Sequence, residues 1–362
     1  MTNVKEYPFY LRATVILFGL VLFSYAMANL KGILIPFCFS VFLAMLLNPL
    51  EARLEKWKIP KVGAISLSIL MSIIVIAAVW YFLATQMMHF KDQMPLLQKR
   101  FSETLAHLQK FLTEKFDISL AKQNQLIAEG QANLKPLIAE TVGTVLGTIT
   151  TATLLPVYTF LLLYYKQLLV NFIYELFAEE NEKEVAVVLT QVKGAIQQYM
   201  FGLLVEGLIV ATLNTIALLI LGVPYAILLG VMGAILNVLP FIGGIIAVIL
   251  PVIVATITKD GFNTQIGIII AYMVIQFTDN HFLVPYIVSS KVKINALVSI
   301  LVVLLGGAVW GLAGMFLSIP FIGVLKIIFD RIPEMKPWGK LLGTEIATRR
   351  RRLTRRPMRV LK

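Results

Sequence analysis

The sequence predicts an all-α, polytopic transmembrane protein with about eight membrane spans, two of which are broken by glycine and proline. Hydrophobic residues make up 58% of the 362 residues and charged residues only 14%. A soluble domain has roughly 45–50% apolar and about 25% charged residues. The apolar residues also gather in runs of about 20 or more, the length that an α-helix needs to cross the hydrocarbon core. Such a chain lacks the polar surface that soluble domains of this length would need.

The apolar runs set the order of the predicted elements. They lie near residues 11–30, 33–50, 62–86, 141–165, 197–221, 224–257, 262–284 and 295–328. The sixth and eighth are too long for one crossing, so each is expected to be either a kinked helix or a broken hairpin. The predicted organisation is transmembrane helices one to three over 1–87, an insert over 88–140, helices four to eight over 141–330 and a basic tail over 331–362.

The polar insert 88–140 carries the periodicity of an amphipathic helix. Its apolar side chains recur at steps of three and four, at Phe90, Met94, Leu97, Phe101, Leu105, Leu108 and Leu112. A partner helix is expected after a break near Asp117. The insert is therefore interpreted either as a self-packed helical hairpin or as a contact between subunits of a homo-oligomer, since a short hairpin buries little apolar surface alone.

Basic residues predict the orientation of the spans. The short segment 51–61 holds Arg53, Lys56, Lys58 and Lys61, so it is expected in the cytoplasm. The N-terminus then lies inside, the insert outside, and an even number of crossings returns the tail inside. Residues 349–362 hold seven arginines and one lysine without an acidic residue, which suits a cytoplasmic tail near anionic lipid headgroups.

The tetrapeptide PFIG occurs twice, as LPFIGG at 239–244 and IPFIGV at 319–324, inside the two overlong runs. In hydrocarbon, a free backbone group is tolerated only against protein or a water-filled cavity. Paired interruptions are typical of transporters whose broken helices line a substrate path. The alternative is that the glycines permit close helix packing and the prolines only kink. The transport-path hypothesis nominates Pro240, Gly243, Gly306, Gly307, Gly311, Gly314 and Pro320.

Polar side chains at membrane depth extend this candidate path. Glu206 has no charged residue within ten positions on either side. An ionised carboxylate in hydrocarbon is expensive, so Glu206 should face a cavity or a partner, or carry a proton. Asp279 ends the seventh run, where a place at the membrane interface is the alternative. With their polar neighbours, these acids complete the candidate path as Glu206, Asn214, Asn237, Asp279 and Asn280.

Several classes of function are not expected. The chain has no G-x-x-x-x-G-K-[ST] phosphate loop, no H-E-x-x-H zinc motif and no G-x-S-x-G nucleophile elbow. We therefore expect that the protein is not an enzyme and has no catalytic residue, cofactor or metal site. We also expect that ATP does not drive its transport. The arginine run lacks interleaved aromatic residues, so nucleic acid is not an expected partner.

Long ordered patterns in this chain resemble the autoinducer-2 exporter (AI-2E) family of bacterial membrane proteins. They are ILIPFCFSVFLAMLLNPLEARLEKWKIPKVGA, GLLVEGLIVATLNTIALLILGVPYAILLGVMGAILNVLPFIGG and FTDNHFLVPYIVSSKVKINALVSILVVLLGGAVWGLAGMFLSIPFIGVL. The likeness covers most of the chain but not the insert. Gly244 and the pair Pro285-Tyr286 depart from the family pattern.

The resemblance implies a multi-pass transporter of the bacterial inner membrane that forms a homo-oligomer and contacts membrane lipid. Its expected partner is a small polar metabolite or signal of the autoinducer-2 kind, which it exports as a secondary transporter. A sodium–proton antiporter is the alternative, with Glu206 and Asp279 as carriers of the coupling proton or sodium ion. A membrane organiser that does not transport is a further alternative, against which the buried Glu206 argues.

Labelling of single cysteines tests the predicted orientation. In a Cys38→Ser background, cysteines placed in 51–61 or 349–362 should react with an impermeant thiol reagent only from the cytoplasmic side, because basic segments stay inside. Cysteines placed in 100–130 should react only from the opposite side. Reaction of 100–130 from the cytoplasmic side alone would overturn the orientation.

Overall fold

The computed structural model confirms the all-α, polytopic fold class. It describes residues 8–92, 94–125, 127–129, 132, 153–177, 182–238, 243–259, 261–288 and 293–344. Within these ranges, six helices are long and apolar enough to cross a membrane. The main helices are α1 (Phe9–Asn29), α2 (Lys31–Lys56), α3 (Lys61–Asp92), α4 (Met94–Phe116), α6 (Leu154–Tyr164), α7 (Lys166–Leu176), α8 (Glu182–Ile220), α9 (Ala226–Asn237), α10 (Gly243–Thr258), α11 (Asn263–Thr278), the π-helix η2 (Asp279–Val288), α12 (Ala296–Arg331), the short 3₁₀ helix η3 (Pro333–Met335) and α13 (Lys336–Leu342).

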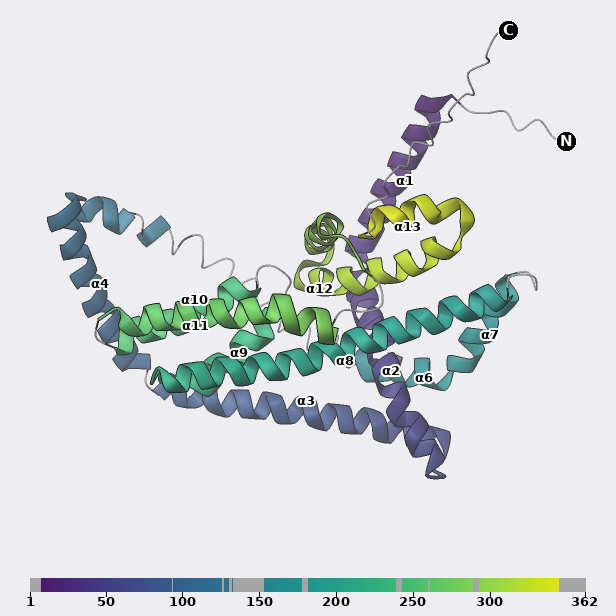
Figure 1. Cartoon of the computed structure of the whole chain (residues 1–362), viewed down its shortest axis with the longest axis horizontal. Coiled ribbons are helices and arrows are strands. Elements are labelled where there is room, and N and C mark those ends of the chain that lie inside the picture. The colour runs from purple at the N-terminus through teal and green to yellow at the C-terminus, as the bar shows by residue number, and fades with distance from the viewer. Residues whose placement is uncertain are drawn as a thin grey trace, which may run out of the picture.

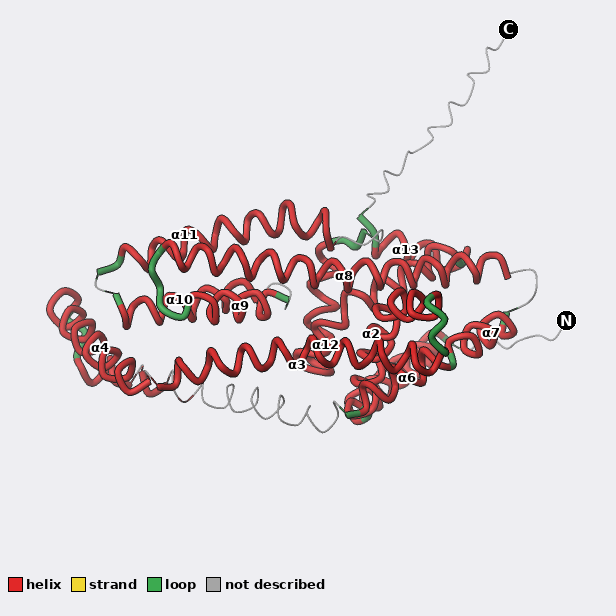
Figure 2. Tube along the Cα trace, turned by 90° about the horizontal axis from the view of Figure 1, so that it is seen from below, coloured by secondary structure: helices red, strands yellow, loops and turns green. Residues whose placement is uncertain are grey.

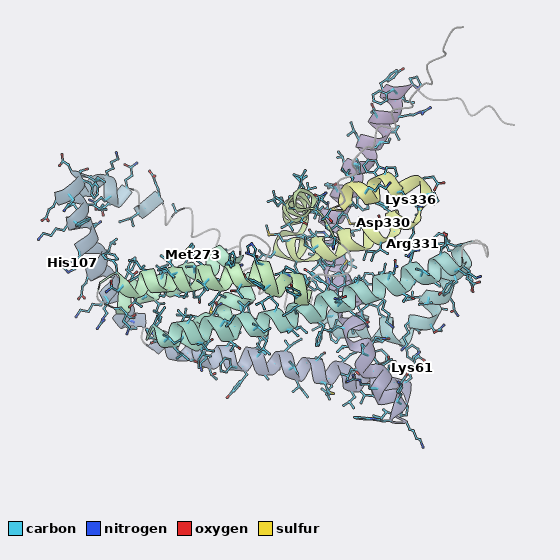
Figure 3. The ribbon with its side chains drawn as sticks, in the orientation of Figure 1. Lys61, His107, Met273, Asp330, Arg331 and Lys336 are labelled. Carbon is cyan, nitrogen blue, oxygen red and sulfur yellow. The ribbon has the colours of Figure 1, made fainter. Side chains whose placement is uncertain are left out.

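The long helices run beside one another and give the molecule two distinct ends. Figures 1 and 2 show α3, α8 and α11 extending along the longest axis, with α4 at one end and α7 at the other. His107 of the insert and Lys61, which follows the corner between α2 and α3, lie at opposite ends in Figure 3. The placement of 51–61 and the insert on opposite sides of the membrane stays a prediction.

Helices α1 and α2 meet at the single residue Leu30 and follow one another in nearly the same direction (Figure 1). Leu30 belongs to the ends of both helices: its N–H donates to the Ala26 carbonyl of α1, and its carbonyl accepts from Ile33 and Leu34 of α2. None of the residues of α1 is buried. This apolar helix therefore presents most of its surface to lipid or to a neighbouring protein, and in its last turn the Met27 carbonyl accepts a bond from Trp310 of α12.

Helix α2 holds together helices that are far apart in the sequence. The buried Ser40 hydroxyl donates to the Leu155 carbonyl of α6, and the Gln197 amide of α8 donates to the Met45 carbonyl. At its far end, Lys166 donates to both oxygens of the fully buried Glu51, over 2.9 and 2.8 Å. A buried carboxylate needs such a partner, so this ion pair fixes the corner between α6 and α7 against α2.

The insert contains the predicted amphipathic helix, α4, and the predicted break. Asp117 adopts a left-handed backbone conformation with φ of 54°, which ends the helix. The chain then turns back, since the buried Gln123 amide donates to the carbonyls of Gln109 and Ile118. The described residues therefore include the start of a self-packed hairpin. Most of the predicted partner helix lies outside them.

The sixth apolar run folds as a hairpin of two short helices, α9 and α10. At 12 and 16 residues, each is shorter than the roughly 20 residues that cross a bilayer. A Cβ at Gly233 of α9 would lie 3.5 Å from the Cβ of Ala247 of α10, so the two helices pack side by side. Gly243 lies against the backbone of Leu236 and Asn237, where the hairpin closes. Residues 239–242, which include Pro240, lie outside the described residues.

The eighth apolar run forms α12 and also folds as a hairpin, but its break is not at PFIG. Trp310 and Gly311 leave the helical conformation, and Gly311 has φ of 60° and ψ of −140°, a region that favours glycine. Gly306 and Gly314 then meet backbone to backbone, and the Ser318 hydroxyl donates to the Val302 carbonyl of the first arm.

Pro320 was expected to mark a break, and this expectation is wrong. Pro320 lies buried inside the helical second arm of α12. The chain turns back instead where glycine alone permits the backbone conformation, at Gly311.

The close contact in α12 predicts unequal effects of two glycine substitutions. Gly314→Ala would drive its Cβ into the Gly306 carbonyl, and such overpacking costs about 1–3 kcal/mol. Gly323→Ala in the same arm meets no atom within 4 Å and removes a glycine from a helix interior. Thermal unfolding in detergent should show a lower Tm for Gly314→Ala and no loss for Gly323→Ala. Equal Tm values would contradict the packed hairpin.

Candidate functional site

Two buried carboxyl groups meet in the interior of the helix bundle. Glu206, in the second half of α8, is 6% exposed, and Asp279, at the junction of α11 and η2, is 2% exposed. Their side chains lie close enough for the two carboxyl groups to interact directly. The structure therefore brings together the two acids that the sequence nominated from spans 73 positions apart.

The tip of the α9–α10 hairpin supplies neutral donors to this pair. Asn237, the last residue of α9, donates its amide to Asp279 Oδ2 over 2.9 Å. Gln276 lies one turn before Asp279 and makes a longer contact of 3.5 Å to the same oxygen. Gly244, in the first turn of α10, packs against the Gln276 side chain. The broken ends of both hairpin helices thus lie beside the acids.

Backbone packing at Gly202 holds η2 against α8. A Cβ at Gly202 would lie 2.5 Å from the Ile287 carbonyl oxygen and 2.8 Å from the Cα of Val288. Gly202 precedes Glu206 by one helical turn and therefore lies on the same face of α8. The glycine allows η2 to approach α8 closely, which positions Asp279 against Glu206. Single π-helical turns often occur at functional sites.

A second pair of buried polar side chains lies where α8, α11 and α9 meet, away from the two acids. Asn214 of α8 and Tyr272 of α11 are 2% and 4% exposed, and both approach Gly233 of α9. A Cβ at Gly233 would lie 3.1 Å from Asn214 Nδ2 and 3.7 Å from the Tyr272 hydroxyl oxygen. Neither Asn214 Oδ1 nor the Tyr272 hydroxyl has a hydrogen-bond partner among the described residues.

The two polar pairs form one line because α8 and α11 are antiparallel. Asn214 is eight residues after Glu206, and Tyr272 is seven residues before Asp279. At 1.5 Å per residue, these separations are about 12 and 10 Å. Asn237 and Gly233 face the same line from α9. The site is therefore an elongated seam with an acidic end and a neutral polar end, covered by the short arm of a broken hairpin.

The other nominated residues lie elsewhere. Asn280 is exposed, although it adjoins Asp279. The four nominated glycines of α12 and Pro320 belong to the α12 hairpin, whose second arm packs through Leu317 against Phe42 of α2 and Ile196 of α8. The structure therefore places them in helix packing, apart from the acidic pair. Gly243 lies at the closing end of the α9–α10 hairpin, near the site.

Tyr272 and Gln276 line the site but are not among the residues that the sequence nominated. Both stand on the face of α11 that carries Asp279, at spacings of seven and three residues, which are helical repeats. That spacing was the available signal. Each residue alone looks like an ordinary polar or aromatic residue near a membrane interface.

The arrangement suits reversible binding of a proton or a small polar group. Two adjacent buried carboxyl groups cannot both be ionised without strong repulsion. Asp279 Oδ1 also accepts no hydrogen bond from an N–H or hydroxyl group of the described residues. A proton shared by the acids, or a hydrogen-bond donor of a bound ligand, would remove the repulsion and give Asp279 Oδ1 a partner. The neutral pair at Asn214 and Tyr272 offers a free acceptor and a hydroxyl group.

Comparison with known proteins places these features in a family. Residues 13–334 match the model of the AI-2E family transporters. The YrrI protein of Bacillus subtilis (strain 168) is 23% identical over 322 residues, which cover 85% of this chain and 88% of YrrI. The AI-2 transport protein TqsA of Escherichia coli (strain K12) is 26% identical, over 83% of this chain and 86% of TqsA. The PerM protein of Escherichia coli (strain K12) is 25% identical, over 88% of this chain and 90% of PerM. A family match over most of the chain, together with an all-α membrane fold, shows that the chain is a multi-pass membrane protein of the AI-2E transporter family.

Proposed function

We propose that this protein is a secondary transporter that exports a small polar metabolite and uses the Glu206–Asp279 pair to couple export to protons. The observation that carries the proposal is the contact between two buried carboxyl groups at the tip of a broken hairpin. An ionisable pair at membrane depth has no structural advantage over apolar packing, so its presence favours a role in transport. The family match supports transport in general.

The proposed coupling follows from the electrostatics of the pair. When the two carboxyl groups are in contact, one proton shared between Glu206 and Asp279 removes their repulsion and supplies a hydrogen-bond donor. Loss of the proton would drive the carboxylates apart. Because Asn237 donates to Asp279 from α9, separation of the acids would also pull on the hairpin. Proton binding and hairpin position are thereby linked, as secondary transport requires.

The substrate class is proposed from the neutral end of the seam and from the relative TqsA, which is named as an AI-2 transport protein. Asn214 Oδ1 and the Tyr272 hydroxyl can bind the hydroxyl or carbonyl groups of a small uncharged molecule. We propose autoinducer-2 or a compound of similar polarity. No ATP-binding motif accompanies the site, so the proton gradient is the proposed driving force, and no enzymatic reaction is proposed.

Sodium–proton antiport is the second candidate. Its support is Asp279 Oδ1, which accepts no hydrogen bond from the described residues, beside the carboxyl group of Glu206, since alkali and other hard cations prefer oxygen ligands. In this scheme sodium displaces the shared proton. A non-transporting membrane organiser is a weaker third candidate, because it gives no reason to retain buried acids.

We further propose that the protein resides in the bacterial inner membrane with both termini in the cytoplasm, and that it forms a homo-oligomer. The largely exposed apolar helix α1 and the exposed Phe101 and Phe111 of α4 support the oligomer. Mass photometry of the solubilised protein should give a multiple of the protomer mass. A single-protomer mass would remove this part of the proposal.

Replacing Glu206 by glutamine tests proton coupling. The amide keeps the shape of the side chain but cannot share a proton with Asp279, so the coupling between the two groups is lost. In proteoliposomes with a pH gradient, transport of labelled autoinducer-2 by Glu206→Gln should fall to the rate of empty vesicles. Exchange of the compound at equal pH should persist. Glu184→Gln, an exposed site in the same helix, should behave like the wild type.

Two other results would contradict the proposal. Gradient-driven transport by Glu206→Gln at the wild-type rate would show that the pair does not couple protons. Proton-driven uptake of ²²Na⁺ without any movement of autoinducer-2 would replace the metabolite proposal with sodium–proton antiport.

A further inference from the structure

Helix α13 is fixed to the start of α12 by one side chain. The Asn295 amide nitrogen Nδ2 donates to the carbonyls of Leu341 and Gly343 over 2.6 and 3.3 Å, and its backbone N–H donates to the Leu342 carbonyl. Its Oδ1 accepts a bond of 2.8 Å from the Val298 N–H and so caps α12. One residue thus holds the last turn of α13 against the first turn of α12.

The packing of α13 leaves an apolar pair on its outer side. Gly339 is buried and lies against Asp330 of α12, which defines the inner face. Trp338 and Leu341 are each 60% exposed, and their spacing of three residues places them on one face. A tryptophan and a leucine therefore stand together on the surface, directly after a membrane helix.

The charges around this apolar pair are predominantly positive. Arg331, Lys336 and Lys340 are exposed, and Figure 3 shows Arg331 and Lys336 where α12 passes into α13. Asp330 is already paired with Lys326. Glu334 is the one exposed acidic residue between Arg331 and Lys340. The sequence continues into residues 349–362, which add seven arginines and one lysine without an acidic residue.

We propose that Trp338, Leu341, Lys336, Lys340 and Arg331, here called the α13 surface, dock on anionic phospholipid headgroups of the membrane that the protein spans. Tryptophan prefers the level of the headgroups. Short helices with apolar and basic faces lie in the plane of the interface, and basic residues beside a membrane helix are attracted to anionic lipids. Only four residues separate α12 from α13, so the surface cannot move far from the bilayer.

The docking has a consequence for α12. Because Asn295 joins both helices, a lipid that holds α13 also holds the two ends of the α12 hairpin at the membrane surface. The α13 surface is thus a lipid-dependent anchor for α12. It is separate from the seam at Glu206 and Asp279, so its test is independent of the proposed transport function.

An environment-sensitive dye on α13 tests the anchor. The full chain with Cys38→Ser and Leu341→Cys is labelled with the dye NBD and placed in nanodiscs of phosphatidylcholine, with or without phosphatidylglycerol. Emission should shift to the blue with phosphatidylglycerol and return toward its original position at high salt, since salt screens surface charge. Equal emission in both lipid mixtures would overturn the proposal.

Matched variants assign the effect to named residues. Arg331→Gln, Lys336→Gln and Lys340→Gln together should reduce the blue shift. The control triple Lys99→Gln, Lys110→Gln and Lys115→Gln, which removes the same charge from α4, should not. An unchanged shift in the first triple would overturn the assignment.

Two further measurements distinguish docking by α13 from lipid binding by the tail and from binding of an acidic protein. A chain that ends at Thr344 should keep part of the shift, and complete loss would assign lipid binding to the tail and overturn docking by α13. A shift on adding polyglutamate but none with phosphatidylglycerol would indicate an acidic protein as the partner and also overturn the proposal.

Discussion

A carboxyl group in the hydrocarbon layer needs a polar partner, because an unpaired charge there is expensive. Glu206 and Asp279 meet this need through each other and through amide donors at the tip of the α9–α10 hairpin. This contact constrains its surroundings. Helix α9 must end at Asn237, α11 must pass into a π-helix, and η2 must approach α8 at Gly202. The broken helices and the acids therefore form one arrangement.

The two hairpins use glycine for different purposes. In the α9–α10 hairpin, Gly233 and Gly244 make room for polar side chains of the seam. In α12, Gly306 and Gly314 bring two backbones together, and Gly311 makes the turn. The first hairpin therefore brings functional groups to the site, whereas the second builds the surface that packs on α2 and α8. The repeated PFIG letters do not predict this difference: the second copy lies inside the helical second arm of α12, and residues 239–242 of the first lie outside the described residues.

Sequence patterns predicted the fold class and the acids because both follow from local chemistry. Long apolar runs require membrane helices, and an isolated Glu206 requires a partner. The same patterns could not place the break in α12, because Pro320 carries the stronger helix-breaking signal while Gly311 alone permits the observed conformation. They also missed Tyr272 and Gln276, whose role depends on which face of α11 meets α8.

The shared proton is the central claim, and infrared spectroscopy tests it directly. Wild-type protein in nanodiscs at neutral pH should show the carbonyl band of a protonated carboxylic acid in a site shielded from water. The band should vanish in both Glu206→Gln and Asp279→Asn, since either amide removes the repulsion that retains the proton, and it should persist in Glu334→Gln, an exposed control. Absence of the band from the wild type, or its persistence in both pair variants, would contradict the account.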